Sequence, residues 1–167
     1  MQVVSSDIPD WSREEKRPFA WQPSRSLLAS IRDYQRHSSS RNPFRVARRK
    51  IASIRHMFWS IITGADIPVN CKIGGGLLLP HPNGVVIHPG SRIGVNCLIF
   101  QQVTIGARND AVPTIAGHVD IGAGAKILGG VQVGQHALIG ANAVVLDDVP
   151  DYCTAVGIPA KCKQYSS

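Results

Sequence analysis

The chain has 167 residues, of which 44% are hydrophobic, and it carries a net charge of +7. This length and composition predict one folded domain with an appended segment and argue against overall disorder. The chain has no run of about 18 apolar residues, which excludes a transmembrane helix, and its first residues lack the pattern of a secretion signal.

The excess of positive over negative charge lies entirely in the first part of the chain. Residues 1–65 hold twelve Lys and Arg against five Asp and Glu, whereas residues 66–167 hold six against six. Such asymmetry is typical of contact with a nucleic acid, an anionic membrane or an acidic protein, but a solvated helix face has the same composition. We expect no nucleic-acid partner, and a peripheral membrane or acidic-protein contact is the alternative to a solvated face.

Two helices are predicted after an irregular arm. Residues 1–22 show no clear periodicity and are expected to form that arm. Apolar residues at helical spacing predict an amphipathic helix over residues 24–37. After a break that contains serine and proline, a second helix is predicted from Phe44 to about Thr63, and Gly64 ends it.

The second helix is basic and amphipathic. Its apolar residues lie largely on one side, and the other side carries Arg45, Arg48, Arg49, Lys50 and Arg55. Such a helix can lie on a membrane surface. Helices this short more often cover a hydrophobic edge, so we expect this one to cap the first coil of the repeat that follows.

An aliphatic residue then recurs every six positions. The residues are Ile67, Ile73, Leu79, Ile87, Ile93, Ile99, Ile105, Ile115, Ile121, Ile127, Val133, Ile139 and Val145. Two extra residues before Ile87 and four before Ile115 are the only interruptions. A six-residue period predicts a parallel β-helix, in which three hexads form one triangular coil. The predicted domains are an N-terminal arm with two helices (1–65), a β-helix (66–150) and a C-terminal tail folding over the last coil (151–167).

The small residues and the second interruption fit the same repeat. Cys71 and Cys97 occupy the fifth position of their hexads, where a small inward residue is needed. We interpret the four cysteines as reduced thiols of a cytoplasmic protein. The four extra residues lie in segment 106–114, which must leave the coil as an external loop, and loops on a rigid scaffold commonly carry function.

The hexad register places four further side chains in one column. Every third hexad stacks on the same face of a triangular coil. In one column the third positions of the hexads are His81, Gln101, Ala123 and Ala141. Because the side chains of Ala123 and Ala141 are small, we expect a groove along this part of the column that could hold a long, thin ligand. This placement assumes that the two-residue interruption beside His81 does not rotate the face.

His81 is a candidate general base. A neutral imidazole can take a proton from an attacking hydroxyl, and it works best when a carboxylate holds its other nitrogen. Asp66 lies about one coil below His81 and is placed for that role. A lone surface histidine is also often without function, and the pattern alone leaves both interpretations open.

These motifs resemble those of the serine O-acetyltransferases and of their relatives in exopolysaccharide gene clusters. The similarity covers roughly residues 60–163 and includes the segments GADIPVNCKIGGGLLLPHPNGVVIHPGSRIG, VDIGAGAKILGGVQVG and VGIPAKCK. It implies a left-handed parallel β-helix, an exception to the usual right-handed crossover. It also implies a homotrimer with active sites between subunits and acetyl-CoA as the acetyl donor.

The resemblance makes His81 the general base on the acceptor hydroxyl and Asp66 the group that orients it. Two positions depart from the family pattern. Serine acetyltransferases carry a second active-site histidine before a proline in the external loop, where this chain has Val112-Pro113. They also carry an aspartate directly before the catalytic histidine, where this chain has Pro80. These departures favour a sugar hydroxyl over serine as the acceptor.

The CoA-binding residues implied by the resemblance share small size or positive charge. They are Gly106 and Ala107, whose backbone meets the pantetheine end, Ala123 and Ala141, which line the groove, and Lys161 near the phosphates, with Lys126 as a weaker candidate.

We therefore expect an acetyl-CoA-dependent O-acetyltransferase that acts by direct transfer on a sugar of an exopolysaccharide precursor. We expect it in the cytoplasm or peripherally at the inner membrane. L-serine is the alternative acceptor, and a non-catalytic trimeric scaffold is the alternative class of protein. The remaining His88, His118 and His136 have no metal-ligand spacing, so we expect surface roles for them and no bound metal.

Overall fold

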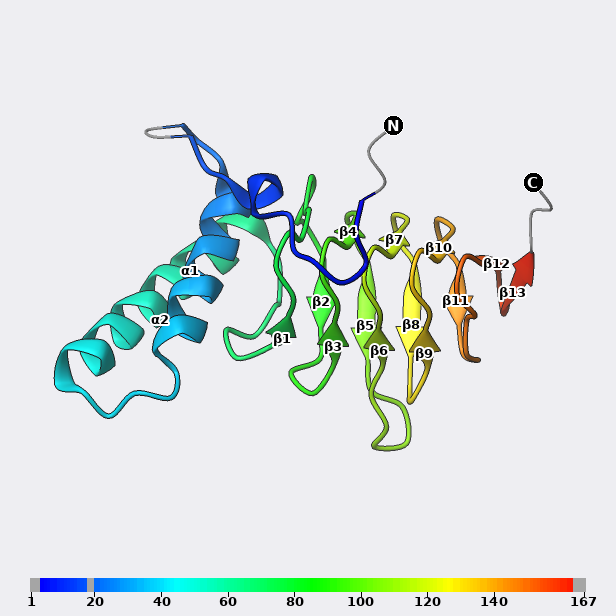
Figure 1. Ribbon diagram of the computed structural model, residues 1–167. Helices are drawn as coiled ribbons and strands as arrows, with labels where there is room; N and C mark the ends of the chain where they lie inside the picture. Colours follow the sequence, from blue (N-terminus) through cyan, green and yellow to red (C-terminus); the bar gives the residue numbers. More distant parts are fainter. Residues whose placement is uncertain (1–3, 18–19, 164–167) are drawn as a thin grey trace.

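Two helices precede a stack of short strands (Figure 1). The computed structural model describes residues 4–17 and 20–163. The helical elements are the single-turn η1 (Trp11–Glu14), α1 (Pro23–His37) and α2 (Pro43–Thr63). Gly64 ends α2 in the left-handed conformation, with φ of 65°, and its N–H donates to the Ser60 carbonyl. Both predicted helices and this glycine cap are confirmed.

The strands are short and stack into three faces. They are β1 (Lys72–Ile73), β2 (Val86–Ile87), β3 (Arg92–Ile93), β4 (Leu98–Ile99), β5 (Thr104–Gly106), β6 (Thr114–Ile115), β7 (Asp120–Ile121), β8 (Lys126–Leu128), β9 (Gln132–Val133), β10 (Leu138–Ile139), β11 (Val144–Val145), β12 (Thr154–Gly157) and β13 (Ala160–Lys163). The sheet orders are β1-β3-β6-β9, β2-β5-β8-β11 and β4-β7-β10-β12-β13. Apart from the antiparallel pair β12 and β13, neighbouring strands come from successive coils, so each face of the parallel β-helix collects one hexad per coil.

The hexad residues form the core. All thirteen aliphatic residues of the repeat point inward and are at most 6% exposed. They also stand in register, as in the pairing of Ile93 with Ile115 and of Ile105 with Ile127. Cys71 and Cys97 are buried free thiols, as their hexad position predicts. Burial of this ladder is the main stabilising contribution to the fold.

Helix α1 covers the first coil. Its Leu27, Leu28 and Ile31 are buried and join the same core cluster as the hexad residues. Among the described residues of α2, Trp59 alone packs against the edge of this core. The expectation that the basic helix α2 caps the first coil is confirmed in part, because α1 covers most of the coil and α2 reaches its edge through Trp59 and His56. The apolar side of α1 faces the coil, and α2 packs on α1.

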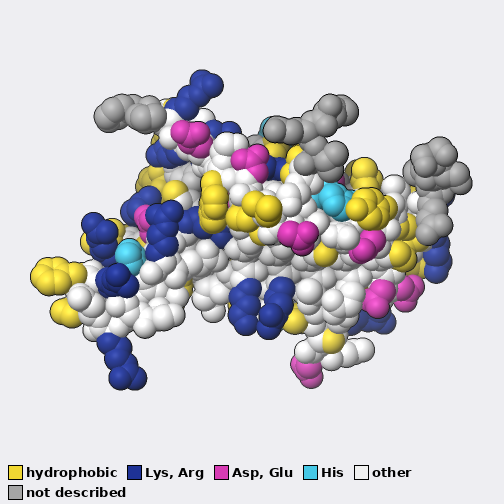
Figure 2. All heavy atoms as spheres, in the orientation of Figure 1, with side chains coloured by type: hydrophobic (Ala, Val, Ile, Leu, Met, Phe, Trp, Pro, Cys, Tyr) yellow, Lys and Arg dark blue, Asp and Glu magenta, His cyan; other side chains and the backbone are white. Residues whose placement is uncertain are grey.

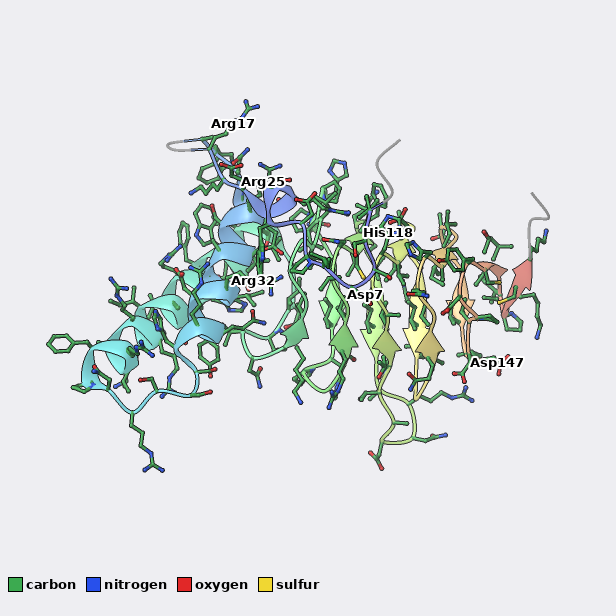
Figure 3. All side chains as sticks on the ribbon, viewed as in Figure 1. Asp7, Arg17, Arg25, Arg32, His118 and Asp147 are labelled. Atoms are coloured by element: carbon green, nitrogen blue, oxygen red, sulfur yellow. The ribbon has the colours of Figure 1, made fainter. Side chains whose placement is uncertain are left out.

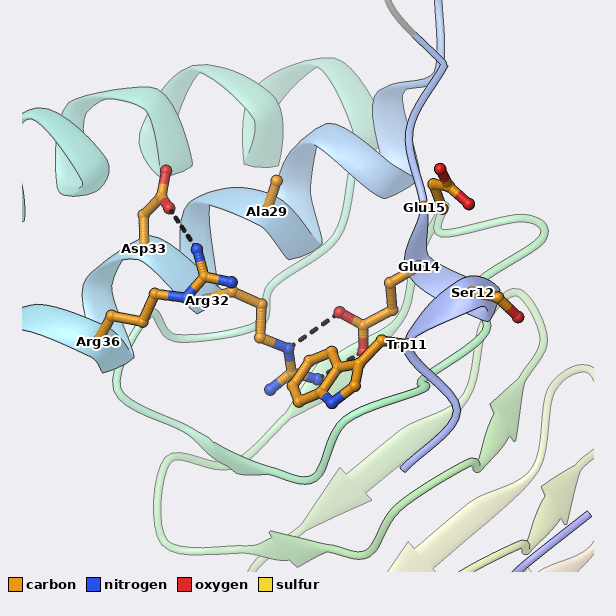
Figure 4. Close-up of a pocket in the computed structure, with 8 residues that line it drawn as sticks. All are labelled: Trp11, Ser12, Glu14, Glu15, Ala29, Arg32, Asp33 and Arg36. Carbon is orange, nitrogen blue, oxygen red and sulfur yellow. Dashed lines mark hydrogen bonds and ion pairs between the residues drawn. The ribbon is translucent and has the colours of Figure 1, made fainter. Parts of the chain in front are cut away.

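The first coil pairs with another coil on one side only. The backbone groups on its free side therefore need other hydrogen-bond partners. Arg32 of α1 donates to the carbonyls of Ile73 and Gly74, at 2.6 Å each. Glu14 of η1 accepts a hydrogen bond from the Leu77 N–H at 2.9 Å and forms an ion pair with Arg32 at 2.7 Å. Figure 4 shows this pair, with the Arg32 guanidinium against the ring of Trp11, 5.4 Å from its centroid. The arm and α1 thus replace a missing coil.

Two further side chains extend this polar cap. Gln35 of α1 donates to the Cys71 carbonyl at 3.2 Å. His56 of α2 places Nε2 2.8 Å from the Ile67 carbonyl oxygen. Both carbonyls belong to the first coil, so both helices bond to the backbone edge there.

The C-terminal segment closes the other end. β12 runs parallel to β10 and continues its face, and β13 then folds back antiparallel to β12. Cys153 and Ala155 of this segment are buried. Within the described part of the chain, no helix is long and apolar enough to cross a membrane. The division of the chain into three domains stays a prediction.

We predict that Glu14→Gln destabilises the protein by about 3 kcal/mol, because it leaves the buried Arg32 without its charged partner. Both side chains of this pair are only 8% exposed. The matched control is Asp33→Asn, which breaks exposed ion pairs with Arg36 and Arg55 and should cost less than about 1 kcal/mol. Urea unfolding of the two variants measures the difference, and equal losses would contradict the capping role of Glu14.

Candidate functional site

The two extra residues beside His81 shift this histidine out of the predicted column. The Gln102 N–H donates to the Asn83 carbonyl at 2.9 Å, just as the Asn142 N–H donates to the Ala123 carbonyl at the same corner two coils further along. Asn83 therefore takes the third position of the column beneath Gln101. The placement of His81 in that position is wrong, because the interruption falls between Leu79 and Asn83 and contains His81. The imidazole lies in an exposed bulge at this corner.

Asp66 is held on the neighbouring coil. Its N–H donates to the Val85 carbonyl at 2.8 Å, and its carbonyl accepts from the Ile87 N–H at 2.9 Å. The segment with Asp66 also meets the turn that follows His81, since the Gly84 N–H donates to the Gly64 carbonyl at 2.9 Å. Both side chains are exposed, and among the described residues no hydrogen bond or ion pair involves either of them.

His56 is a residue near this site that the sequence analysis did not single out. It lies on the inner side of α2, and its ring nitrogen binds the carbonyl of Ile67, directly after Asp66. Burial lowers the pKa of His56, and the hydrogen bond to Ile67 and the charge of Asp66 only partly offset this effect. A neutral His56 thus joins α2 to the strand segment that carries Asp66.

Ala123 and Ala141 line one edge of the face formed by β2, β5, β8 and β11. They stand one above the other just before β8 and β11, and neither side chain extends past Cβ. Backbone packing here is tight, since a Cβ on Gly122 would lie 2.6 Å from the Ala141 nitrogen. Lys126 folds toward the same edge and donates to the carbonyls of Gln102 and Gly124 at 3.0 and 2.8 Å.

The external loop lies at the opposite edge of that face. Gly106 ends β5, Ala107 is exposed, and the loop closes through two hydrogen bonds between the backbones of Arg108 and Ala111. This confirms the predicted external loop, which Figure 1 shows projecting below β5 and β6. A cleft of about 560 Å³ separates the loop from the next two coils, with Leu128 and residues 146–148 on its far side.

Lys161 lines a second, smaller cleft of about 290 Å³ between β13 and the last coil. Asp147 and Asp148 border both clefts, and Figure 3 shows Asp147 on the side of the β-helix opposite His118. The structure thus brings Gly106, Ala107 and Lys161 to one side. Ala123 and Ala141 lie on the other edge, and a single chain does not bring the two groups together.

His118 and His136 form a pair on the far corner of the β-helix. Their Nδ1 atoms are 2.8 Å apart, and Tyr152 stacks on His136. Burial lowers the pKa of His118, while the charge of Asp120 opposes this effect. Across residues 4–17 and 20–163, no group of three or more His, Cys, Asp or Glu side chains is arranged to hold a metal ion.

Comparison with known proteins points to one kind of enzyme. No family model matches the chain. A serine acetyltransferase of Synechococcus elongatus is 44% identical over 105 residues, covering 60% of this chain and 43% of that protein. The chain spans about half the length of the curated relatives that it matches.

Solved structures extend the likeness beyond the repeat. A serine acetyltransferase in complex with CoA has a TM-score of 0.72 and 35% identity, covering 87% of this chain and 59% of that one. A soybean serine acetyltransferase complexed with serine has a TM-score of 0.64 and 32% identity, covering 83% of this chain and 70% of that one. The predicted fold, a left-handed parallel β-helix with a short helical segment, is confirmed.

We predict that the protein loses stability as the pH falls below 6.5. The pKa values of His56 and His118 lie below their ordinary value of 6.5 in the folded chain, so the unfolded chain binds more protons in this range. The contribution is complete above pH 6.5 and is lost between 6.5 and the folded pKa values. His56→Gln, which keeps a donor for Ile67, should flatten the dependence of the unfolding free energy on pH. An unchanged slope in this variant would contradict the assignment.

Proposed function

Because the chain belongs to the family of serine acetyltransferase-like hexapeptide-repeat acyltransferases, we propose that it is an O-acetyltransferase that takes its acetyl group from acetyl-CoA. The observation that carries this proposal is the CoA-bound serine acetyltransferase structure, whose fold matches 87% of this chain. The helices α1 and α2 therefore share in the likeness together with the β-helix.

His81 acts as the general base in this proposal. Its imidazole takes the proton from the acceptor hydroxyl as the oxygen attacks the thioester carbonyl, and CoA leaves as the thiolate and is then protonated. Asp66 orients the imidazole and stabilises its charged form. The exposed bulge of His81 and the backbone hydrogen bond between Gly84 and Gly64 support this pairing, since they place both segments at one corner.

The CoA-binding residues imply a site shared between subunits. Ala123 and Ala141 offer a low wall along one edge of a face, and Gly106 and Ala107 offer backbone groups along the other. In a threefold assembly each edge faces a different neighbour, so edges of two subunits complete one groove. Lys161 then serves as a point charge for the CoA phosphates. This geometry supports the proposed homotrimer.

L-serine is the acceptor that the comparisons support best. The similar proteins are named serine acetyltransferases, and one solved relative is complexed with serine. A sugar hydroxyl of an exopolysaccharide precursor is the second candidate. Val112 in the external loop and Pro80 before His81 favour a sugar. Both residues are apolar, whereas the serine acetyltransferases that this sequence resembles have ionisable side chains at these positions for serine recognition.

The cytoplasm is the compartment that we assign to this reaction. Acetyl-CoA is an intracellular donor, and all four cysteines are free thiols in the structure. Free thiols are typical of a reducing compartment.

We predict that His81→Ala lowers kcat by roughly 10²- to 10⁴-fold, the usual contribution of a general base. Binding of acetyl-CoA, measured by calorimetry, should stay within about two-fold of the unaltered protein, because His81 acts on the acceptor. His37→Ala, at the end of α1, is the control and should retain full activity. Near-normal turnover in His81→Ala would refute the mechanism, and a chain that binds no acetyl-CoA at millimolar concentration would favour the scaffold.

The acceptor is tested by release of free CoA with L-serine, nucleotide sugars and lipid-linked sugars in parallel. We expect kcat/KM to be highest for L-serine, by at least about ten-fold over each sugar, because the similar proteins are named serine acetyltransferases and one solved relative is complexed with serine. Higher kcat/KM for a sugar would instead identify the apolar Val112 and Pro80 as marks of a different acceptor.

A further inference from the structure

Helix α2 carries a continuous apolar stripe that the fold leaves uncovered. We call Phe44, Ile51, Ile54, Phe58 and Ile61 the α2 stripe; they recur at intervals of seven, three, four and three residues. Each is between 52% and 81% exposed. Side chains at this spacing lie on one side of a helix along its whole length.

The α2 stripe has no part in the folded core. The buried residues of α2 are Ala52 and Thr63, and Trp59 packs against the core from the same side. At helical spacing these three residues lie about a third of a turn around the helix from the α2 stripe. Large contiguous apolar patches on a protein surface usually mark an interaction site.

Arg48 and Lys50 flank the α2 stripe at helical spacing, and further basic residues lie on the other side of the helix. Helix α2 contains five Lys and Arg and no Asp or Glu. Arg45, Arg48 and Lys50 are exposed, and none of them takes part in an ion pair within the described residues. Figure 2 shows dark-blue side chains gathered over the helical end of the molecule. The surface beside the stripe is therefore strongly positive.

The positive charge beside the α2 stripe distinguishes between the partners that could cover it. A second copy of α2 would complement the apolar spacing, but it would place Arg48 and Lys50 against like charges at the flanks of a helix pair. An anionic lipid surface satisfies both features, because it takes the apolar side chains among the acyl chains and the basic flanks at the headgroups. Helix α2 would then lie in the plane of the membrane surface.

An aromatic rim adds a second feature of such helices. Trp21 is 72% exposed and packs on Trp59, with ring centroids 5.6 Å apart. The ammonium of Lys16 lies 6.0 Å from the Trp59 ring. Tryptophan and lysine side chains are suited to the boundary between headgroups and acyl chains.

We propose that α2 docks the protein on an anionic lipid surface through the α2 stripe. This goes beyond the proposed acetyl transfer and does not depend on it. Asp66 follows Thr63, the last residue of α2, by three positions. A docked helix therefore holds the first coil, with the proposed catalytic pair, beside the membrane surface.

Co-sedimentation of the full chain with vesicles tests the docking. Vesicles of phosphatidylcholine with 30% phosphatidylglycerol should bind the protein, and binding should weaken as salt screens the charges. Replacing Arg45, Arg48 and Lys50 with Gln should weaken binding by about five-fold per side chain. Ile54→Ser should weaken it by about ten-fold, because the stripe loses buried apolar area.

Leu138→Ser on β10 is the matched control, since Leu138 is an exposed aliphatic residue far from α2, and it should bind as the unaltered protein does. Circular dichroism verifies that each variant is folded. No binding to phosphatidylglycerol vesicles overturns the proposal. If Ile54→Ser instead lowers the mass of the assembly in light scattering, a second copy covers the stripe. Equal binding by Ile54→Ser and the unaltered protein also overturns it.

Discussion

The unpaired edge of the first coil is the constraint on which the rest of the structure depends. A β-helix pairs each coil with the next, but its first coil must find other partners for the carbonyls of Ile73 and Gly74. Arg32 supplies them, and its buried charge in turn requires Glu14 from the arm. The irregular N-terminal segment and α1 are therefore parts of the fold. The same requirement brings His56 of α2 against the segment that carries Asp66.

Above that edge, the six-residue register decides where function can reside. Inward positions are filled by the aliphatic ladder, and any extra residue must leave the coil. The two extra residues put His81 in an exposed bulge, and the four extra residues form the external loop after Gly106. The His81 bulge and the external loop lie at opposite edges of the face formed by β2, β5, β8 and β11. A site that uses both edges requires neighbouring subunits, which is the physical argument for the proposed trimer.

The parts of this arrangement that the sequence predicts are those that depend on local periodicity. The inward residues, both helices, the cap at Gly64 and the external loop follow from the spacing of apolar and turn residues. The column position of His81 does not, because two extra residues between Leu79 and Ile87 can be inserted at several points with the same count. The backbone hydrogen bond from Gln102 to Asn83 decides among them. The contact of His56 with Ile67 joins a helix to a coil, and no local pattern encodes it.

The two helices look alike as amphipathic segments, yet they meet different surroundings. Helix α1 turns its apolar side to the first coil and donates hydrogen bonds from Arg32 to the backbone at its edge. The apolar side of α1 is therefore buried within the fold. Helix α2 buries only Ala52 and Thr63 and meets the first coil through His56 and Trp59, whereas the α2 stripe faces away from the protein. An exposed stripe of this size opposes solubility, and the five basic residues of α2 offset that cost in water while favouring an anionic surface. Helix α2 thus supplies five of the seven excess positive charges of the chain, and it is the helix whose apolar stripe the fold leaves uncovered.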